Sequence, residues 1–249
     1  NIIIAGGQES MTKSPHVINL RGGTKMGDAT MVDTMIKDGL TDSMCNIHMG
    51  VTAENLAKEY DISRATQDES AAKSQALAGA AQKAGFFDEE IVAVSVPGRK
   101  ESIVVAKDEY LKPETTSEML SKLRPCFIKD GTVTPGNASG INDSAAAVLL
   151  ASGSEVTKRN LKPLAKIIAY AQAGCDPKTM GAGPIKAVPL VLQKAGWSLD
   201  DVDLFELNEA FAAQACAVNK GLNVDTSKVN INGGAIALCQ PIGASGARI

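Results

Sequence analysis

The chain has 249 residues, of which 44% are hydrophobic and 21% charged, so it is long and apolar enough to bury a sizeable core. Its formal net charge of −3 provides no chain-wide positive field, which argues against nucleic acid or a membrane surface as a partner. No apolar run approaches the roughly 18 residues that predict a membrane span, and no signal peptide is recognisable.

The cysteine pattern predicts neither a disulfide framework nor a metal site, because CxxC spacing is absent and only His16 and His48 accompany the five cysteines. We therefore expect an intracellular protein, cytoplasmic or mitochondrial, with its thiols reduced. Each cysteine is expected to be a small buried hydrophobic residue: Cys45, Cys126, Cys175, Cys216 and Cys239.

The first half of the chain contains one clearly signalled helix. It begins after Ser63, a favourable N-cap, and runs through Ala-rich sequence to Lys83 before Gly85 ends it. Before it, residues 1–5 are typical of a buried strand, and at the other end residues 243–249 are typical of a helix that has barely begun. Both ends of the chain are thus expected to lie within secondary structure.

Short β-branched runs alternate with Ala-rich helical segments along the rest of the chain, which predicts an α/β fold with helices on the faces of a sheet. Residues 12–141 are richer in loops and charge, and are expected to be an excursion from one core domain. The predicted elements are a strand pair at 91–96 and 103–105, a fully buried strand at 145–151, strands at 165–171 and 203–207, and helices at 185–194 and 210–220.

Asn208 lies where an apolar strand runs directly into an Ala-rich helix. Its amide could stabilise developing negative charge on a ligand, or it could simply cap the helix, and spacing alone favours the cap. Residues 232–246 are rich in glycine before a helix start, which suits either an anion site or a packing turn. They do not have the spacing of a dinucleotide or phosphate loop, so a nicotinamide-dependent oxidoreductase gains little support.

Four stretches, in order along the chain, resemble the thiolase family and its biosynthetic acetoacetyl-CoA branch most of all. Asn208–Phe211 reads NEAF, and Asn232–Gly246 resembles the signature GGAIALGHPIGASG. Ile2–Met11 is similar to the strand and turn after the nucleophile helix, and Thr132–Asp143 is similar to the coenzyme A loop.

The resemblance implies the thiolase fold, an α/β fold in which two similar βαβαβαββ halves form five α-β-α-β-α layers, with an inserted loop domain. Residues 1–11 would end the N-terminal half, residues 12–141 would form the loop domain over coenzyme A, residues 142–160 would be the last strand region of the N-terminal half, and residues 161–249 the C-terminal half. Both halves are expected to be incomplete.

The chemistry implied is condensation of two acetyl-CoA molecules to acetoacetyl-CoA and the reverse thiolysis, through a cysteine acyl-enzyme. Coenzyme A thioesters would be substrates, and no cofactor is expected. The nucleophile segment would precede Asn1, and a second cysteine in a CxGGG turn would follow Ile249. Within the signature, Gln240 stands where the family has a catalytic His, and Cys239 replaces a Gly.

Asn208 and Gln240 are therefore the catalytic candidates, and Gln240 can donate a hydrogen bond but cannot act as a base near neutral pH. For Lys112 a solvated charge is an equal alternative to a phosphate contact. The residues that the resemblance assigns to coenzyme A are His48, Met49, Lys112, Phe127, Ala138, Ser139, Gly140 and Phe211.

Two functions remain open: an acetyl-CoA acetyltransferase, inactive as this chain stands, or a catalytically silent acyl-CoA-binding or assembly subunit. Gln240 is the residue that separates them. The resemblance also implies a homodimer or homotetramer, with residues 12–38 matching the loop used in tetramer contacts.

Overall fold

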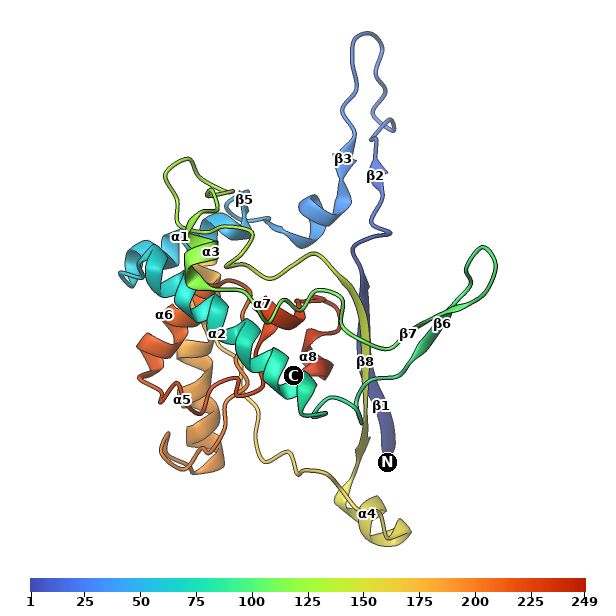
Figure 1. Ribbon diagram of the computed structural model, residues 1–249, viewed down its shortest axis with the longest axis vertical. Coiled ribbons are helices and arrows are strands. Elements are labelled where there is room, and N and C mark those ends of the chain that lie inside the picture. The colour runs from blue at the N-terminus through green and yellow to red at the C-terminus, as the bar shows by residue number, and fades with distance from the viewer.

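The computed structural model describes residues 1–249 and consists of a helical body beside a long two-stranded ladder (Figure 1). The ladder pairs β1 (Ile2–Ser10) with β8 (Asp143–Ala151) in antiparallel register, Ile2 opposite Ala151 and Ser10 opposite Asp143. The chain between these strands, including α1, α2 and α3, therefore leaves the ladder after β1 and returns to it at β8.

The helical body is built on α1 (Met49–Glu59), α2 (Arg64–Lys83) and α6 (Ala212–Leu222), and α6 packs against both of the other two. His48 is the N-cap of α1, and α2 has the predicted N-cap, because the hydroxyl of Ser63 accepts from the amide of Thr66. Alanines on α6 let α1 approach closely around the fully buried Leu56, which gives the main hydrophobic core.

Shorter helices complete the body. A second cluster joins α2, α3 (Ser117–Ser121), α6 and α7 (Ala235–Leu238) around the buried Ile236. The remaining helical segments are a π-helical turn at Met35–Gly39, α4 (Gly153–Arg159), a 3₁₀ turn at Pro177–Ala182, α5 (Gly183–Ala195) and α8 (Ser245–Arg248). The last of these packs against the β1–β8 ladder.

Three small antiparallel hairpins extend from this frame. β2 (His16–Val17) pairs with β3 (Val32–Asp33) at the base of a long finger that projects away from the body, and β6 (Val94–Val96) pairs with β7 (Ile103–Val105) in a second projection (Figure 1). β4 (Thr41–Asp42) and β5 (Ile47–His48) form the turn that leads into α1. The second hairpin confirms the strand pair predicted around residues 97–98.

The strand predictions were wrong in three respects. The strands expected to be buried are exposed, with Ile4 at 76% and Leu149 at 64%, because each has only the other as a partner and no element covers the ladder's faces at these positions. Residues 165–171 form no strand, and residues 203–207 make only an isolated bridge from Phe205 to Val229, because neither segment finds a continuous partner. The helices predicted at residues 185–194, 210–220 and 243–249 are confirmed within a few residues.

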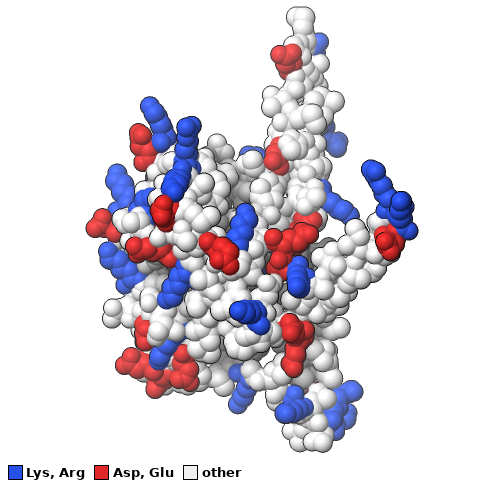
Figure 2. All heavy atoms as spheres, in the orientation of Figure 1, with Lys and Arg blue, Asp and Glu red and all other residues white.

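The surface carries charges of both signs interspersed over the visible face, as the small net charge requires (Figure 2). All cysteines are free, but only Cys239 is buried, while Cys126 is exposed and the other three are half-buried. The expectation of buried cysteines was therefore wrong for four of the five, because they lie on helix faces and loops at the edge of the packed body. None of the helices has both the length and the apolar character required to cross a membrane.

Candidate functional site

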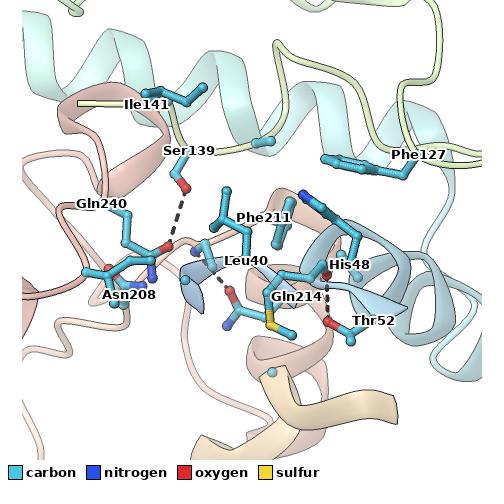
Figure 3. A pocket seen from close by; sticks show the side chains of 18 of the residues that line it. Leu40, His48, Thr52, Phe127, Ser139, Ile141, Asn208, Phe211, Gln214 and Gln240 are labelled. Atoms are coloured by element: carbon cyan, nitrogen blue, oxygen red, sulfur yellow. Dashed lines mark hydrogen bonds between the residues drawn. The ribbon is translucent and has the colours of Figure 1, made fainter. Parts of the chain in front are cut away.

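A cavity of about 800 Å³ opens where the loop after α3, the turn before α6 and the glycine-rich loop meet the start of α1 (Figure 3). Its walls are mainly apolar, and polar side chains converge on it from separate segments: His48 and Thr52 of the α1 region, Ser139 of the 132–141 loop, and Asn208, Gln214 and Gln240 of the C-terminal segments. A mostly apolar cavity with a few converging polar groups is typical of a small-molecule site.

Aromatic rings form one wall of the cavity. The His48 ring stacks on Phe127 at a centroid distance of 4.7 Å, and Phe127 meets Phe211 edge-on at 5.9 Å. His48 is held by its role as the α1 N-cap, in which its Nδ1 accepts from the amide of Gly50 at 3.0 Å. Burial lowers the pKa of this imidazole, so the neutral form that can accept this bond is favoured.

Hydrogen bonds to its backbone hold the 132–140 loop to α1 and to the turn before α6. The carboxylate of Glu54 accepts from the amides of Thr132 and Val133, each at 2.9 Å. Farther along, the amide of Ser139 donates to the carbonyl of Ala210 at 3.0 Å, and the amide of Ala212 donates to the carbonyl of Asn137 at 2.8 Å. The loop and the turn before α6 therefore run side by side as one rigid edge of the site.

Asn208 and Gln240 bring two amide side chains to the same cavity (Figure 3). Ser139 Oγ donates to Gln240 Oε1 at 3.3 Å, and neither the Gln240 Nε2 nor any side-chain atom of Asn208 is hydrogen-bonded to the chain. Both side chains are half-buried, and open amide donors in a mainly apolar cavity suit a ligand oxygen. The helix-cap interpretation of Asn208 was wrong, because the N-cap of α6 is Phe211.

Cys239, next to Gln240, is a packed residue in a strained turn. Its φ of +68° lies in the left-handed region that favours glycine, and its side chain is only 3% exposed. Burial raises the pKa of its thiol to about 11, with a smaller opposing effect from a backbone hydrogen bond to Gly140. A thiol in this state is protonated at neutral pH and is a poor nucleophile.

All of the residues expected from the sequence line the cavity except Lys112. The Lys112 ammonium lies 5.6 Å from the centre of the Tyr110 ring, and Tyr110 does line the cavity. Sequence reasoning missed four prominent lining residues, which no local motif singles out: Leu40, Tyr110, Met180 and Gln214. No group of three or more His, Cys, Asp or Glu side chains is placed to hold a metal ion.

The structure therefore combines helices and strands with a mainly apolar cavity that is lined by the two side-chain amides of Asn208 and Gln240. Residues 1–154 match the family described as "Thiolase, N-terminal domain", and residues 161–249 match "Thiolase, C-terminal domain". The chain belongs to the thiolase family.

Relatives and solved structures agree with this assignment. The chain is 57% identical to an acetyl-CoA acetyltransferase of Rhizobium meliloti (strain 1021), covering all of this chain and 63% of that protein. It is 53% identical to the cytosolic acetyl-CoA acetyltransferase of Rattus norvegicus, again with 63% of that protein covered. Human mitochondrial 3-ketoacyl-CoA thiolase in complex with CoA superposes with a TM-score of 0.94 at 48% identity, over 99% of this chain and 62% of that one.

The expected thiolase fold is therefore confirmed for residues 1–249. The chain spans slightly less than two thirds of the length of these relatives.

Proposed function

We propose that residues 1–249 form the coenzyme A thioester-binding part of an acetyl-CoA acetyltransferase, which condenses two acetyl-CoA molecules to acetoacetyl-CoA and catalyses the reverse thiolysis. The observation that carries the proposal is the meeting of Asn208 and Gln240 in one apolar cavity walled by His48 and Phe127. The rings would flank the pantetheine chain, and the amides would receive the thioester oxygen.

The acyl transfer itself needs a cysteine thiolate, and no cysteine on the cavity side of this chain suits that role. Burial raises the pKa values of Cys126 and Cys239, and the latter is enclosed in its turn. We assign the nucleophile and the second catalytic cysteine to segments outside residues 1–249, as the thiolase resemblance implies. Residues 1–249 would then contribute substrate binding and oxyanion stabilisation.

A catalytically silent acyl-CoA-binding subunit is the second candidate, and Gln240 is the observation that favours it. An amide can hold a thioester oxygen but cannot take up and release a proton near pH 7, which the His of the family signature does. Such a chain would keep the affinity of the site while losing the step that activates a nucleophile.

We also propose self-association into a homodimer or homotetramer in the cytoplasm or mitochondrion. The support comes from the projecting finger, residues 12–38, whose apolar side chains include Leu20 at 54% exposure, Met26 at 95% and Met31 at 60%. Side chains of this kind on an extended projection are typical of a protein interface. Sedimentation velocity of the protein with and without Met26→Ser and Leu20→Ser tests the finger's role.

Calorimetric titration with coenzyme A and with acetyl-CoA tests the main proposal. Residues 1–249 are expected to bind both ligands, and Phe127→Ala should weaken both, because it removes the ring between His48 and Phe211. NAD serves as the negative control. The same chain should show no thiolysis of acetoacetyl-CoA, and a turnover within tenfold of ~10 s⁻¹, the median for enzymes, would show that the catalytic groups have been misassigned.

A further inference from the structure

Glu209, the neighbour of Asn208, is a buried carboxylate with no cationic partner. It is 7% exposed and takes part in none of the ion pairs of the structure. Burying an unpaired charge is costly, so its retention calls for either several hydrogen bonds or a task that an apolar side chain cannot perform.

Three donors from three separate segments satisfy this carboxylate. Its Oε2 accepts from the hydroxyl of Ser74 in α2 at 2.7 Å and from the amide of Ile236 in α7 at 3.2 Å. Its Oε1 accepts from the side-chain amide of Asn230 at 3.1 Å. A carboxylate can only accept, so the identity and direction of all three bonds are fixed.

The same donors hold the two catalytic segments on either side of Glu209. Asn230 also brackets Leu207, accepting from its amide and donating to its carbonyl, both at 2.8 Å. Ser74 Oγ accepts from the amide of Gly234 at 2.9 Å, and a side chain at Gly234 would overlap the Glu209 carboxylate. The backbone of the glycine-rich loop therefore approaches the carboxylate directly.

Asn208 adjoins Glu209 in the turn before α6, and Gln240 follows α7, whose first turn donates to the carboxylate through the amide of Ile236. We propose that Glu209 is a positioning residue, which sets the separation of the Asn208 and Gln240 amides so that both reach one thioester carbonyl oxygen. This inference rests on the proposed function, and it assigns the selectivity for an acyl oxygen to a residue that lines no part of the cavity.

The test compares two non-transferable ligands that differ at the acyl group. One is the ketone analogue of acetyl-CoA in which a methylene group replaces the thioester sulfur, and the other is S-ethyl-CoA, which lacks the carbonyl oxygen. The unsubstituted chain should bind the ketone about tenfold more tightly, the usual effect of a good hydrogen bond to the oxygen. Glu209→Gln keeps the shape of the side chain but turns one acceptor into a donor, and should reduce this preference to less than twofold while leaving S-ethyl-CoA affinity nearly unchanged.

Glu54→Gln is the matched control. Glu54 is equally buried at 7%, and its carboxylate likewise accepts from a hydroxyl and from backbone N–H groups, but these belong to Thr132 and Val133 and not to the segments that carry Asn208 and Gln240. This variant should lose as much stability as Glu209→Gln yet keep the preference for the ketone. Ser74→Ala, which removes one donor only, gives a milder second variant should Glu209→Gln not fold, and should reduce the preference two- to fivefold.

A preference for the ketone that stays near tenfold in Glu209→Gln or in Ser74→Ala overturns the positioning role. Equal loss of the preference in Glu209→Gln and Glu54→Gln also overturns it, because general loosening would then be the cause. Equal binding of the two ligands by the unsubstituted chain refutes this inference but leaves the proposed function standing. Failure of both ligands to bind refutes the proposed function, and with it this inference.

Discussion

The side-chain amide of Asn137 donates to the carboxylate of Asp68 at 2.9 Å, and both side chains are almost completely enclosed. Arg64 completes the arrangement, donating through Nε to the other carboxylate oxygen at 2.7 Å. The side-chain oxygen of Asn137 accepts from the backbone amide of Thr134 at 2.8 Å. The loop beside the cavity is thereby anchored to α2, a helix that lies far from it in the sequence.

Replacing Asn137 by Ala should destabilise the protein by about 2–4 kcal/mol, because the change leaves a buried carboxylate oxygen and a buried amide without partners. Chemical denaturation measures this directly. Glu118→Ala is the comparison, since its ion pair with Lys122 is exposed and should contribute less than ~0.5 kcal/mol. Equal losses in the two variants would contradict the anchoring role of Asn137.

At position 239, glycine should give a more stable protein than alanine, the reverse of the usual order. Both Cys239→Ala and Cys239→Gly remove the thiol, but only glycine relaxes at a φ of +68°. The Gly variant is therefore expected to be about 1 kcal/mol more stable than the Ala variant in denaturant unfolding. At Ala217, inside α6, glycine should instead be less stable than the native alanine by a similar amount.

His48 should make the stability of the protein depend on pH. Burial lowers its pKa in the folded state, so its contribution is present above the unfolded pKa of about 6.5 and is lost as the pH falls toward the folded value. Protonation also destroys the acceptor that caps α1. His48→Asn keeps an acceptor for the Gly50 amide without titrating, and the wild-type chain should lose stability relative to this variant between pH 7 and pH 5. A constant difference across that range would exclude this titration.

Gln240→His should restore base catalysis in a full-length protein that carries both family cysteines. If Gln240 occupies the base position, the imidazole should raise the rate of acyl-enzyme formation by ~10²–10⁴, the range for a positioned general base. Asn208→Ala in that restored enzyme should instead slow condensation by roughly 10²-fold through loss of an oxyanion donor. Rapid-mix measurement of acyl-enzyme formation separates the two effects, and an unchanged acylation rate on introducing His would move the active centre elsewhere.

Replacing Lys112 tests whether its ammonium contacts a coenzyme A phosphate or is only a solvated surface charge. If its ammonium binds a coenzyme A phosphate, Lys112→Ala should weaken binding about three- to tenfold at low salt, and the loss should shrink as ionic strength rises. Lys129→Ala, in the loop after Phe127, is a charge-matched control. Identical affinities for all three proteins would assign Lys112 to the solvated surface, where its ammonium lies over the Tyr110 ring.

Local signals in the sequence were sufficient to predict most helices and most of the candidate residues that line the cavity. Ser63 and Gly85 bracket α2 because capping is a local interaction, and the motif around Asn208 and Gln240 placed both amides in one cavity. His48, Phe127 and Ser139 were likewise indicated by motif and also line it.

Tertiary structure alone decided what depends on partners from distant segments. Whether residues 145–151 would be buried, or residues 165–171 would form a strand, rests on which segments lie beside them, and sequence periodicity does not contain that information. The bonds from Glu209 to Ser74 and Ile236, and from Asn137 to Asp68, join residues separated by between 27 and 135 positions, and three of these residues stand in helices. A polar side chain reveals no such role until folding supplies its partner, because buried hydrogen bonds are satisfied in space and not along the chain.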